Sequence, residues 1–354
     1  MLSSVKEVGT AQATHLLTKI LDATKEGVLV VDRGLKIVAS NRAAELAFRV
    51  LNGDLTGCKL NDLIDDDALL TAFVKGCAKR ETSDFHLKLG PKGNRRRYDV
   101  HVAPLELDGV PHAIGFFYDV TQVHRLENIR QEFLSNISHE LRTPLTSILA
   151  FVETLENGGL EDSENNRHFL SVIQRNGERM RDLIADILEL SQIEAGSVSI
   201  ELKEVPLWRH VEEIMTNLSS MAAEREISLK NETDPNAVVS ADPKRLGQML
   251  TNLVDNAIRF NRRAGSVTIS DEQLGNRRLI RVADTGEGIG QKELQRVFER
   301  FYRVDRARTR EIGGTGLGLA IVKHLARLHG GEVSVESELG TGTTFTIDIP
   351  ARQG

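Results

Sequence analysis

A histidine in the segment 138–145, SHELRTPL, has neighbours that suit a nucleophile. On a helix, His139 lies about 200° from Ile137, opposite the apolar stripe that contains Ile137, and is therefore expected to be exposed. The adjacent Glu140 can accept the proton of one ring nitrogen while the other nitrogen attacks. Pro144 removes the helical hydrogen bond to the Glu140 carbonyl and loosens the helix nearby. The segment predicts a nucleophilic histidine that a reactant must reach.

The segment 252–260, NLVDNAIRF, carries polar residues that could bind a nucleotide. Asn252 and Asn256 are four residues apart and so project from the same face of a helix, where their amide oxygens can meet Mg²⁺ and its phosphates. Arg259, one position short of the next turn, can add positive charge. Two Asn on a helix are also typical of an ordinary surface, so this spacing gains weight only together with other motifs.

Three glycine-rich segments follow in the last third of the chain. In 284–290, DTGEGIG, the carboxylate of Asp284 at a strand end can accept a hydrogen bond from an exocyclic amine, while the glycines let the backbone approach a flat base. The segment 313–319, GGTGLGL, opens a helix and offers free backbone N–H groups to phosphates. It is not a P-loop, because no Lys-Ser/Thr follows the glycines. The segment 340–345, GTGTTF, is expected to turn beside the base and enter a final strand.

An aromatic and basic segment lies between the first two of these glycine motifs. Phe298, Phe301 and Tyr302 fit a hydrophobic core and the anchors of a nucleotide lid equally well. The basic residues that follow them are Arg303, Arg306, Arg308 and Arg310.

The order of these motifs carries a resemblance to a known family. The segment 133–146, FLSNISHELRTPLT, resembles the H-box of the sensor histidine kinases of two-component systems. The Asn-bearing helix, the glycine motifs and the aromatic segment resemble the N, G1, F, G2 and G3 boxes of the ATP-binding domain that histidine kinases share with gyrase, Hsp90-type chaperones and MutL. The resemblance implies ATP-dependent phosphorylation of His139 with Glu140 as base, and transfer to an aspartate of a separate response regulator protein.

The resemblance also assigns roles position by position. It implies that Asn256 ligates Mg²⁺, that Asn252 and Arg259 contact the phosphates of ATP, and that Asp284 binds the adenine amine. Arg142 and Thr143 match the phosphoacceptor region, where a Thr one turn after the histidine can position a water that dephosphorylates the regulator. The other positions assigned to the nucleotide site are Phe260, Gly286, Gly288, Ile289, Phe301, Tyr302, Gly314, Thr315, Gly316, Leu317, Gly318, Leu319 and Thr344.

The elements that position these residues are expected to form a multidomain α+β chain. In 121–196, apolar residues recur at steps of three and four in two stretches, which predicts a helical hairpin. Two helices with one apolar face each bury those faces best in a four-helix bundle from two chains, so we expect a homodimer. Residues 197–354 alternate between strand and helix patterns, which predicts a sheet with helices on one face. The resemblance implies that this domain is an α/β sandwich of the GHKL ATPase type.

The N-terminal part reads as a small domain with an antiparallel sheet over 15–120, after a tail or helix at 1–14. Strands are expected in 27–40 around an Asp-Arg-Gly turn and at 83–90, 96–105 and 110–119, with hairpin turns at 91–94 and 107–109. The stretches VLVVDRGLKIVASN and GFFYDVT resemble a PAS sensor domain. Its ligand stays unknown; neither Cys58 nor Cys77 has the context of a flavin photoreceptor.

The composition of the chain restricts the kinds of partner and the cellular location that we expect. The chain has 354 residues, 27% charged residues and a net charge of −6, which argues against a nucleic-acid partner. No stretch approaches 18 consecutive apolar residues, and the two cysteines form no CxxC pair. We expect a cytoplasmic protein, or the cytoplasmic portion of an inner-membrane protein if an anchor precedes this sequence. Residues 265–354 hold 14 of the 29 Gly, where phosphates would be approached by backbone.

Two other classes of function explain part of the pattern. A gyrase-like or chaperone-like ATPase that drives a conformational clamp would explain the glycine motifs but leaves His139 and its hairpin unexplained. A binding module, in which the PAS domain scaffolds a regulator, would make the nucleotide site residual. Steady phosphate release without a phosphoenzyme favours the first alternative, and absence of nucleotide binding favours the second.

Overall fold

The computed structural model describes residues 22–48, 55–90, 95–107, 109–159, 165–304 and 314–351. Outside them lie the expected tail at 1–14, the turn at 91–94, Asp108, Gly313 and three arginines of the basic segment, namely Arg306, Arg308 and Arg310. The chain divides into two compact units between Glu132 and Phe133.

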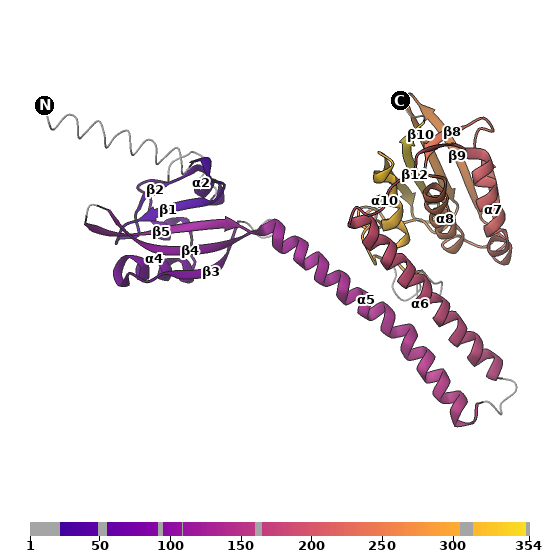
Figure 1. Cartoon of the computed structure of the whole chain (residues 1–354), viewed down its shortest axis with the longest axis horizontal. Coiled ribbons are helices and arrows are strands. Elements are labelled where there is room, and N and C mark those ends of the chain that lie inside the picture. The colour runs from indigo at the N-terminus through magenta and orange to yellow at the C-terminus, as the bar shows by residue number, and fades with distance from the viewer. Residues whose placement is uncertain are drawn as a thin grey trace. The chain divides into compact units, whose positions relative to one another are not determined.

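The N-terminal unit is built on a five-stranded antiparallel sheet of order β2-β1-β5-β4-β3 (Figure 1). Its strands confirm the expected positions closely. Asp32 closes the predicted turn, because its Oδ1 accepts hydrogen bonds from the backbone N–H groups of Gly34 and Lys36. The strands are β1 Gly27–Val31, β2 Ile37–Ser40, β3 Ser83–Leu89, β4 Arg96–Leu107 and β5 Val110–Asp119.

Among the described residues of this unit, three helices accompany the sheet, and side chains of all three enter the core. They are α2 Arg42–Phe48, α3 Leu60–Leu63 and α4 Asp67–Lys79. Fully buried Phe73 of α4 and Phe117 of β5 are among the largest core side chains. Asp66 caps α4 by accepting a hydrogen bond from the Leu69 N–H.

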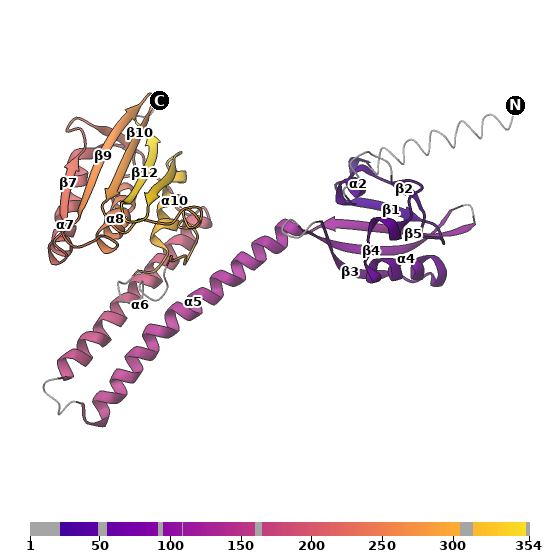
Figure 2. The ribbon, with the colours of Figure 1, turned by 180° about the vertical axis from the view of Figure 1, so that it is seen from behind.

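A long helical hairpin follows β5 almost without a break. Helix α5, Thr121–Thr154, begins two residues after the strand ends, and a π-helical turn, η1 Leu155–Gly159, closes it. Helix α6, Asn166–Glu194, runs back beside the second half of α5 in both views (Figures 1 and 2). Several stripe residues stay exposed in one chain, including Leu145 at 45% and Leu188 at 59%. The apolar stripe is therefore incompletely buried by the single chain.

The C-terminal domain contains a five-stranded sheet of order β11-β12-β10-β9-β7, parallel between β7 and β9 and otherwise antiparallel, and a two-stranded sheet β6-β8. The strands are β6 Lys203–Pro206, β7 Ser228–Glu232, β8 Val238–Ala241, β9 Ser266–Leu274, β10 Arg277–Asp284, β11 Glu332–Glu338 and β12 Gly342–Pro350.

Three helices cover one face of the larger sheet, as Figures 1 and 2 show from opposite sides. They are α7 Leu207–Glu224, α8 Pro243–Arg259 and α10 Gly318–Leu328. Leu246, Leu250 and Leu253 of α8 are fully buried in the core they share with the sheet. The expected sheet with helices on one face is confirmed. Among the described residues, no helix combines the length and apolarity needed to cross a bilayer.

Candidate active site

His139 lies on α5, and its side chain is exposed, as its position opposite the apolar stripe predicts. Pro144, inside the same helix, leaves the Glu140 carbonyl without its helical partner. The hydroxyl of Thr143 donates a hydrogen bond of 3.2 Å to the backbone carbonyl of His139, and Arg142 is exposed beside it. The histidine is thus accessible on a helix that is locally weakened.

Glu140 is held by two arginines. Its Oε2 accepts hydrogen bonds from Arg179 of α6 at 3.3 Å and from Arg303 at 3.1 Å. The Arg303 side chain is nearly buried, and its guanidinium also donates to the carbonyl of Gly314. The acidic neighbour of the histidine is therefore connected, through Arg303, to the glycine-rich segment that precedes helix α10, Gly318–Leu328.

Helix α8 presents the amide residues from its polar side, because its apolar side is buried in the core. Asn252 and Asn256 are both half-buried, one turn apart. The Nδ2 of Asn252 lies 3.4 Å from the Gly318 carbonyl, so the Asn-bearing helix adjoins the start of α10. Arg259 donates through Nε to Asp255 at 2.6 Å, and Phe260 caps the helix with a half-exposed side chain.

Asp284 ends β10 in a tight backbone pocket. Its Oδ1 accepts hydrogen bonds from the N–H groups of Gly286 at 2.8 Å and Thr343 at 3.3 Å. Burial raises the pKa of Asp284 to about 6, although the two backbone hydrogen bonds act in the opposite direction. Its Oδ2 makes no hydrogen bond with the described residues, so one carboxylate oxygen remains available to an exocyclic amine.

The glycines around Asp284 allow the backbone segments to come together. A Cβ on Gly286 would lie 2.4 Å from the Phe260 carbonyl oxygen, and a Cβ on Gly288, whose φ is +71°, would lie 2.0 Å from that of Glu338. The Ile289 N–H donates to the Ser337 hydroxyl at 2.8 Å. Helix α8, the DTGEGIG loop and the end of β11 therefore form one close-packed wall.

Thr343, which the sequence reasoning missed, is the threonine of the last glycine motif that faces this wall. It is buried, pairs with Asp284 across β10 and β12, and bonds to Ser337 at 2.9 Å. The predicted Thr344 pairs with Ala283 instead and is directed to the other face of the strand. The alternation along β12, in which Thr343 shares a face with buried Phe345, is the signal that could have found it.

The aromatic segment packs against both the hairpin and the glycine loop. Phe301 is buried, with its ring centroid 5.7 Å from that of Phe133 on α5. Its backbone N–H donates to the Gly316 carbonyl at 2.8 Å. Tyr302 lies under the guanidinium of Arg296, and the Phe298 ring meets the Phe345 ring edge-on. In this structure the aromatic residues are core contacts.

The described part of the GGTGLGL loop lies against helix α6. The Thr315 hydroxyl donates to Oδ2 of Asp186 at 2.6 Å and accepts from the Leu317 N–H at 3.2 Å. Gly314 and Gly316 have φ values of +131° and +73°, which only glycine adopts easily. Leu317 is fully buried, and Leu319 packs on the same core, so the loop is fixed at its C-terminal end.

Further polar contacts join α6 to the C-terminal domain. Glu189 accepts hydrogen bonds from Arg245 and Gln248 of α8, and Glu194 forms an ion pair with Arg300. His324 lies 3.7 Å from the same Glu194. Burial raises the pKa of Asp186, and nearby Glu189 and Asp182 act in the same direction. These contacts could not be foreseen from the sequence motifs.

The exposed histidine lies on a helical hairpin, and the adjoining domain pairs an Asn-bearing helix with glycine loops around a half-buried aspartate. This combination is that of a histidine kinase catalytic core. Three family models match the chain, in agreement with this class. They are the PAS fold over residues 21–125, the His Kinase A (phospho-acceptor) domain over 129–196, and the histidine kinase-, DNA gyrase B-, and HSP90-like ATPase over 241–353. The chain belongs to the sensor histidine kinases of two-component systems.

Two curated relatives illustrate the similarity. Sensor histidine kinase WalK of Bacillus subtilis (strain 168) is 36% identical over 250 residues, which cover 70% of this chain and 40% of the relative. Sensor protein kinase WalK of Staphylococcus aureus (strain Newman) is 32% identical over 347 residues, or 97% of this chain and 56% of the relative. The chain thus spans about half the length of the curated relatives it matches.

Solved structures show the same fold. Histidine kinase ThkA, in a complex with response regulator protein TrrA, superposes with a TM-score of 0.52 at 23% identity over 92% of this chain and 96% of that one. Acinetobacter baumannii histidine kinase AdeS gives a TM-score of 0.50 at 24% identity, over 61% of this chain and 98% of that one. The ATPase family model further identifies the C-terminal domain as an ATP-binding domain.

Proposed function

We propose that this chain phosphorylates His139 with ATP and then passes the phosphoryl group to an aspartate of a separate response regulator. The observation that carries the proposal is the pairing, within one unit, of an exposed histidine with a glycine-lined site whose half-buried carboxylate keeps one oxygen for an adenine amine. The solved complex of ThkA with response regulator protein TrrA supports the choice of partner.

In the phosphorylation step, a ring nitrogen of His139 forms a bond to the γ-phosphorus of ATP as the bond from that phosphorus to the bridging oxygen breaks. ADP carries away the electron pair of the broken bond, and the other ring nitrogen gives its proton to Glu140. In this structure Oε2 of Glu140 pairs with Arg179 and Arg303, so these ion pairs compete with a contact between the carboxylate and the ring of His139. Release of these two ion pairs would therefore free Oε2 for that contact.

The nucleotide pocket has residues that fit a Mg²⁺–ATP complex. The glycines beside Asp284 let the loop backbone pack closely on Phe260 and Glu338 and so shape the wall next to the carboxylate. Asn256 shares a helix face with Asn252, which adjoins the glycine loop at Gly318. Asn256 would hold the cation, which neutralises phosphate charge when it is bound. Asn252 and Arg259 would contact phosphates, and Arg259 would exchange its present partner Asp255 for them.

We also propose that the working unit is a homodimer. Exposed leucines and isoleucines on both hairpin helices, among them Leu145, Leu149, Ile184 and Leu188, require a partner surface. A second hairpin would bury them in a four-helix bundle. We place this work in the cytoplasm, where ATP is present and where reduced cysteines such as Cys58 and Cys77 persist.

The test of the proposed function is labelling of the purified chain with [γ-³²P]ATP and Mg²⁺. The wild type is expected to yield an acid-labile, base-stable phosphoprotein, and His139→Gln to yield none. His168→Gln, which changes another exposed helical histidine of the hairpin, is the matched control and should label normally. Equal labelling of His139→Gln and wild type contradicts the proposal. Steady phosphate release without phosphoenzyme would favour a clamp-type ATPase.

A further inference from the structure

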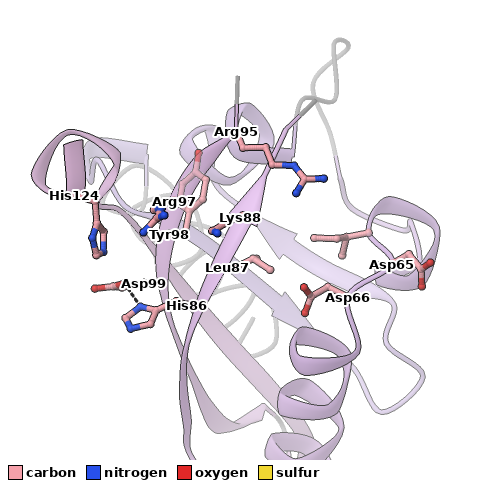
Figure 3. Close-up of a pocket in the computed structure, with 11 residues that line it drawn as sticks. Asp65, Asp66, His86, Leu87, Lys88, Arg95, Arg97, Tyr98, Asp99 and His124 are labelled. Atoms are coloured by element: carbon pink, nitrogen blue, oxygen red, sulfur yellow. Dashed lines mark hydrogen bonds and ion pairs between the residues drawn. The ribbon is translucent and has the colours of Figure 1, made fainter. Parts of the chain in front are cut away.

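A hollow of about 600 Å³ lies at one edge of the N-terminal sheet (Figure 3). Strands β3 and β4 supply most of its wall, the loop before α4 supplies one rim, and the first turn of α5 supplies another. It lies within the N-terminal unit and shares no residue with the candidate active site. Its charged and titratable lining includes Lys88, Arg95, Arg97, His86, Asp99 and His124.

The arrangement of the cations in this hollow lowers the stability of the strand pair β3–β4. Lys88 and Arg97 are directly opposite each other in the register of β3 and β4, and like charges at opposed positions destabilise a strand pair. Within the described residues, neither side chain has an ion pair or a hydrogen bond, and neither does Arg95. Three positively charged side chains therefore lie at the wall of one hollow, and no ion pair joins any of them to a residue in the described part of the chain.

Among the described residues, none of the three carboxylates that also line the hollow forms an ion pair with Lys88, Arg95 or Arg97. Asp99 is bonded to His86 at 2.6 Å, and Asp66 is engaged as the cap of α4. Asp65 and Asp66 lie on the side of the hollow away from Arg97 and His124 (Figure 3). The guanidinium and ammonium groups on this wall are thus not held by the carboxylates of the same lining and can contact a ligand.

The same wall is bonded to the start of the helix that leads out of the domain. The backbone N–H of Arg97 donates to the Thr121 hydroxyl at 2.9 Å, and the Arg97 carbonyl accepts from the Val120 N–H at 2.9 Å. His124, on the first turn of α5, lines the hollow with its ring centroid 6.3 Å from that of His86. A ligand on Arg97 would therefore touch the junction between β4 and α5.

We propose that this hollow binds a small anion that carries at least two negative charges, in the form of carboxylate or phosphate groups. Two or more negative charges are needed because Lys88, Arg95 and Arg97 lie at separate positions of the wall, where a single anionic group cannot contact all of them. Bidentate contact with the planar guanidinium of half-buried Arg97 provides the anchor. The bound anion removes the repulsion between the opposed Lys88 and Arg97 and holds the start of α5.

The test is isothermal titration of the full chain with trisodium citrate and, separately, with pyrophosphate, at an ionic strength kept constant with sodium chloride. One of the two anions is expected to bind saturably, and which one binds decides between carboxylate and phosphate. Hydrogen exchange of the same samples should slow in peptides that span 86–99 and 119–126. Both readouts are independent of kinase activity, so they can fail while the proposed function holds.

Variants locate the binding. Arg97→Gln should weaken binding by about tenfold or more, because a charge-assisted hydrogen bond is lost. Arg96→Gln is the matched control: it removes an adjacent arginine that pairs with Asp119 at 3.4 Å and does not line the hollow, and it should change affinity by less than about twofold. Lys88→Gln, at an exposed position, repeats the test should Arg97→Gln unfold the domain.

Three results would overturn the proposal. The first is the absence of saturable binding by both anions. The second is equal weakening by Arg96→Gln and Arg97→Gln, which would mean that only the net charge matters. The third is exchange protection confined to peptides of the C-terminal domain, which would place the anion in the nucleotide pocket.

Discussion

The hydroxyl of Thr315 donates a hydrogen bond of 2.6 Å to the carboxylate of Asp186, and it thereby joins the glycine loop of the nucleotide site to helix α6 of the hairpin. The same threonine accepts from the Leu317 N–H, so it also closes the turn that opens α10. With Arg303 on Glu140 and Arg245 on Glu189, it forms a set of polar contacts that hold the C-terminal domain on the hairpin. A nucleotide that reshapes the loop must break at least this bond.

The bond between Thr315 and Asp186 should appear as a coupling energy. In a double-mutant cycle of Thr315→Val and Asp186→Ala, we expect a coupling of about 1–2 kcal/mol in the free energy of urea unfolding, as for a partly buried hydrogen bond to a charged acceptor. Asp182→Ala is the control, since exposed Asp182 pairs with its neighbour Arg181 and should add independently to Thr315→Val. Additivity of Thr315→Val with Asp186→Ala would show that the contact contributes nothing.

Asp284→Asn should separate nucleotide binding from stability. The asparagine Oδ1 can keep both backbone hydrogen bonds, but its Nδ2 would present a donor where the adenine amine also donates. We expect ATP affinity to fall by about a hundredfold, as when a buried donor is left unpaired. At pH 7 the free energy of unfolding should rise by about 1–3 kcal/mol, because a buried charge is removed. Calorimetry and urea unfolding check the two effects, and unchanged ATP affinity would contradict the assigned role.

The raised pKa of Asp284 gives a pH dependence with a definite sign. The folded pKa is about 6, above the ordinary value of 3.8, so the folded chain binds the proton more tightly. The contribution of Asp284 to stability is therefore full below about pH 4 and is lost as the pH rises through about 6. ATP affinity should run the other way and decline below about pH 6, where the carboxylate is protonated. In Asp284→Asn both dependences should flatten; a profile identical to wild type would rule out Asp284 as their source.

Gly288→Ala should damage the nucleotide pocket through a clash as well as through backbone strain. The new Cβ would lie 2.0 Å from the Glu338 carbonyl oxygen, and we expect a loss of about 3 kcal/mol in stability together with loss of ATP binding. Gly275→Ala is the matched control, since Gly275 also has a positive φ, +59°, but has open space around its Cβ position. It should cost about 1 kcal/mol and leave ATP affinity unchanged. Equal costs measured by thermal unfolding would argue against the close packing.

Thr143→Ala should distinguish two activities of the phosphoacceptor region. The Thr143 hydroxyl, at present bonded to the His139 carbonyl, is proposed to orient a water toward a phosphorylated regulator. In the Thr143→Ala variant we expect the rate of regulator dephosphorylation to fall at least tenfold below that of the wild type. The rate of autophosphorylation should stay within about twofold of the wild-type rate. Thr146→Ala, three residues further along α5, is the control. Equal loss of both activities in Thr143→Ala would remove this role.

Much of the fold follows from local pattern. The exposure of His139 follows from helical periodicity, and the strands of the N-terminal sheet follow from alternating apolar residues bounded by turns. The close approach of backbone segments at Gly286 and Gly288 could be predicted, because glycines mark where backbones meet. These features depend on residues that are close in sequence, or on a residue type such as glycine that has few structural roles.

What could not be predicted depends on contacts between distant segments. Asp186 has no distinguishing sequence context, and its bond to Thr315 spans 129 positions. The choice between Thr343 and Thr344 requires the pairing register of β10 and β12, which a one-residue shift would invert. The opposed Lys88 and Arg97 likewise emerge only from the register of β3 and β4.

Phe301 has a backbone φ of +59°, in the left-handed region, which a bulky side chain rarely occupies. Contacts with Phe133 and Gly316 hold it there against a conformational cost of about 1–2 kcal/mol. The aromatic segment is therefore held in a strained backbone conformation by its tertiary contacts. If those two contacts were lost, nothing in them would offset this cost any longer, and the backbone at Phe301 would relax toward a more common conformation.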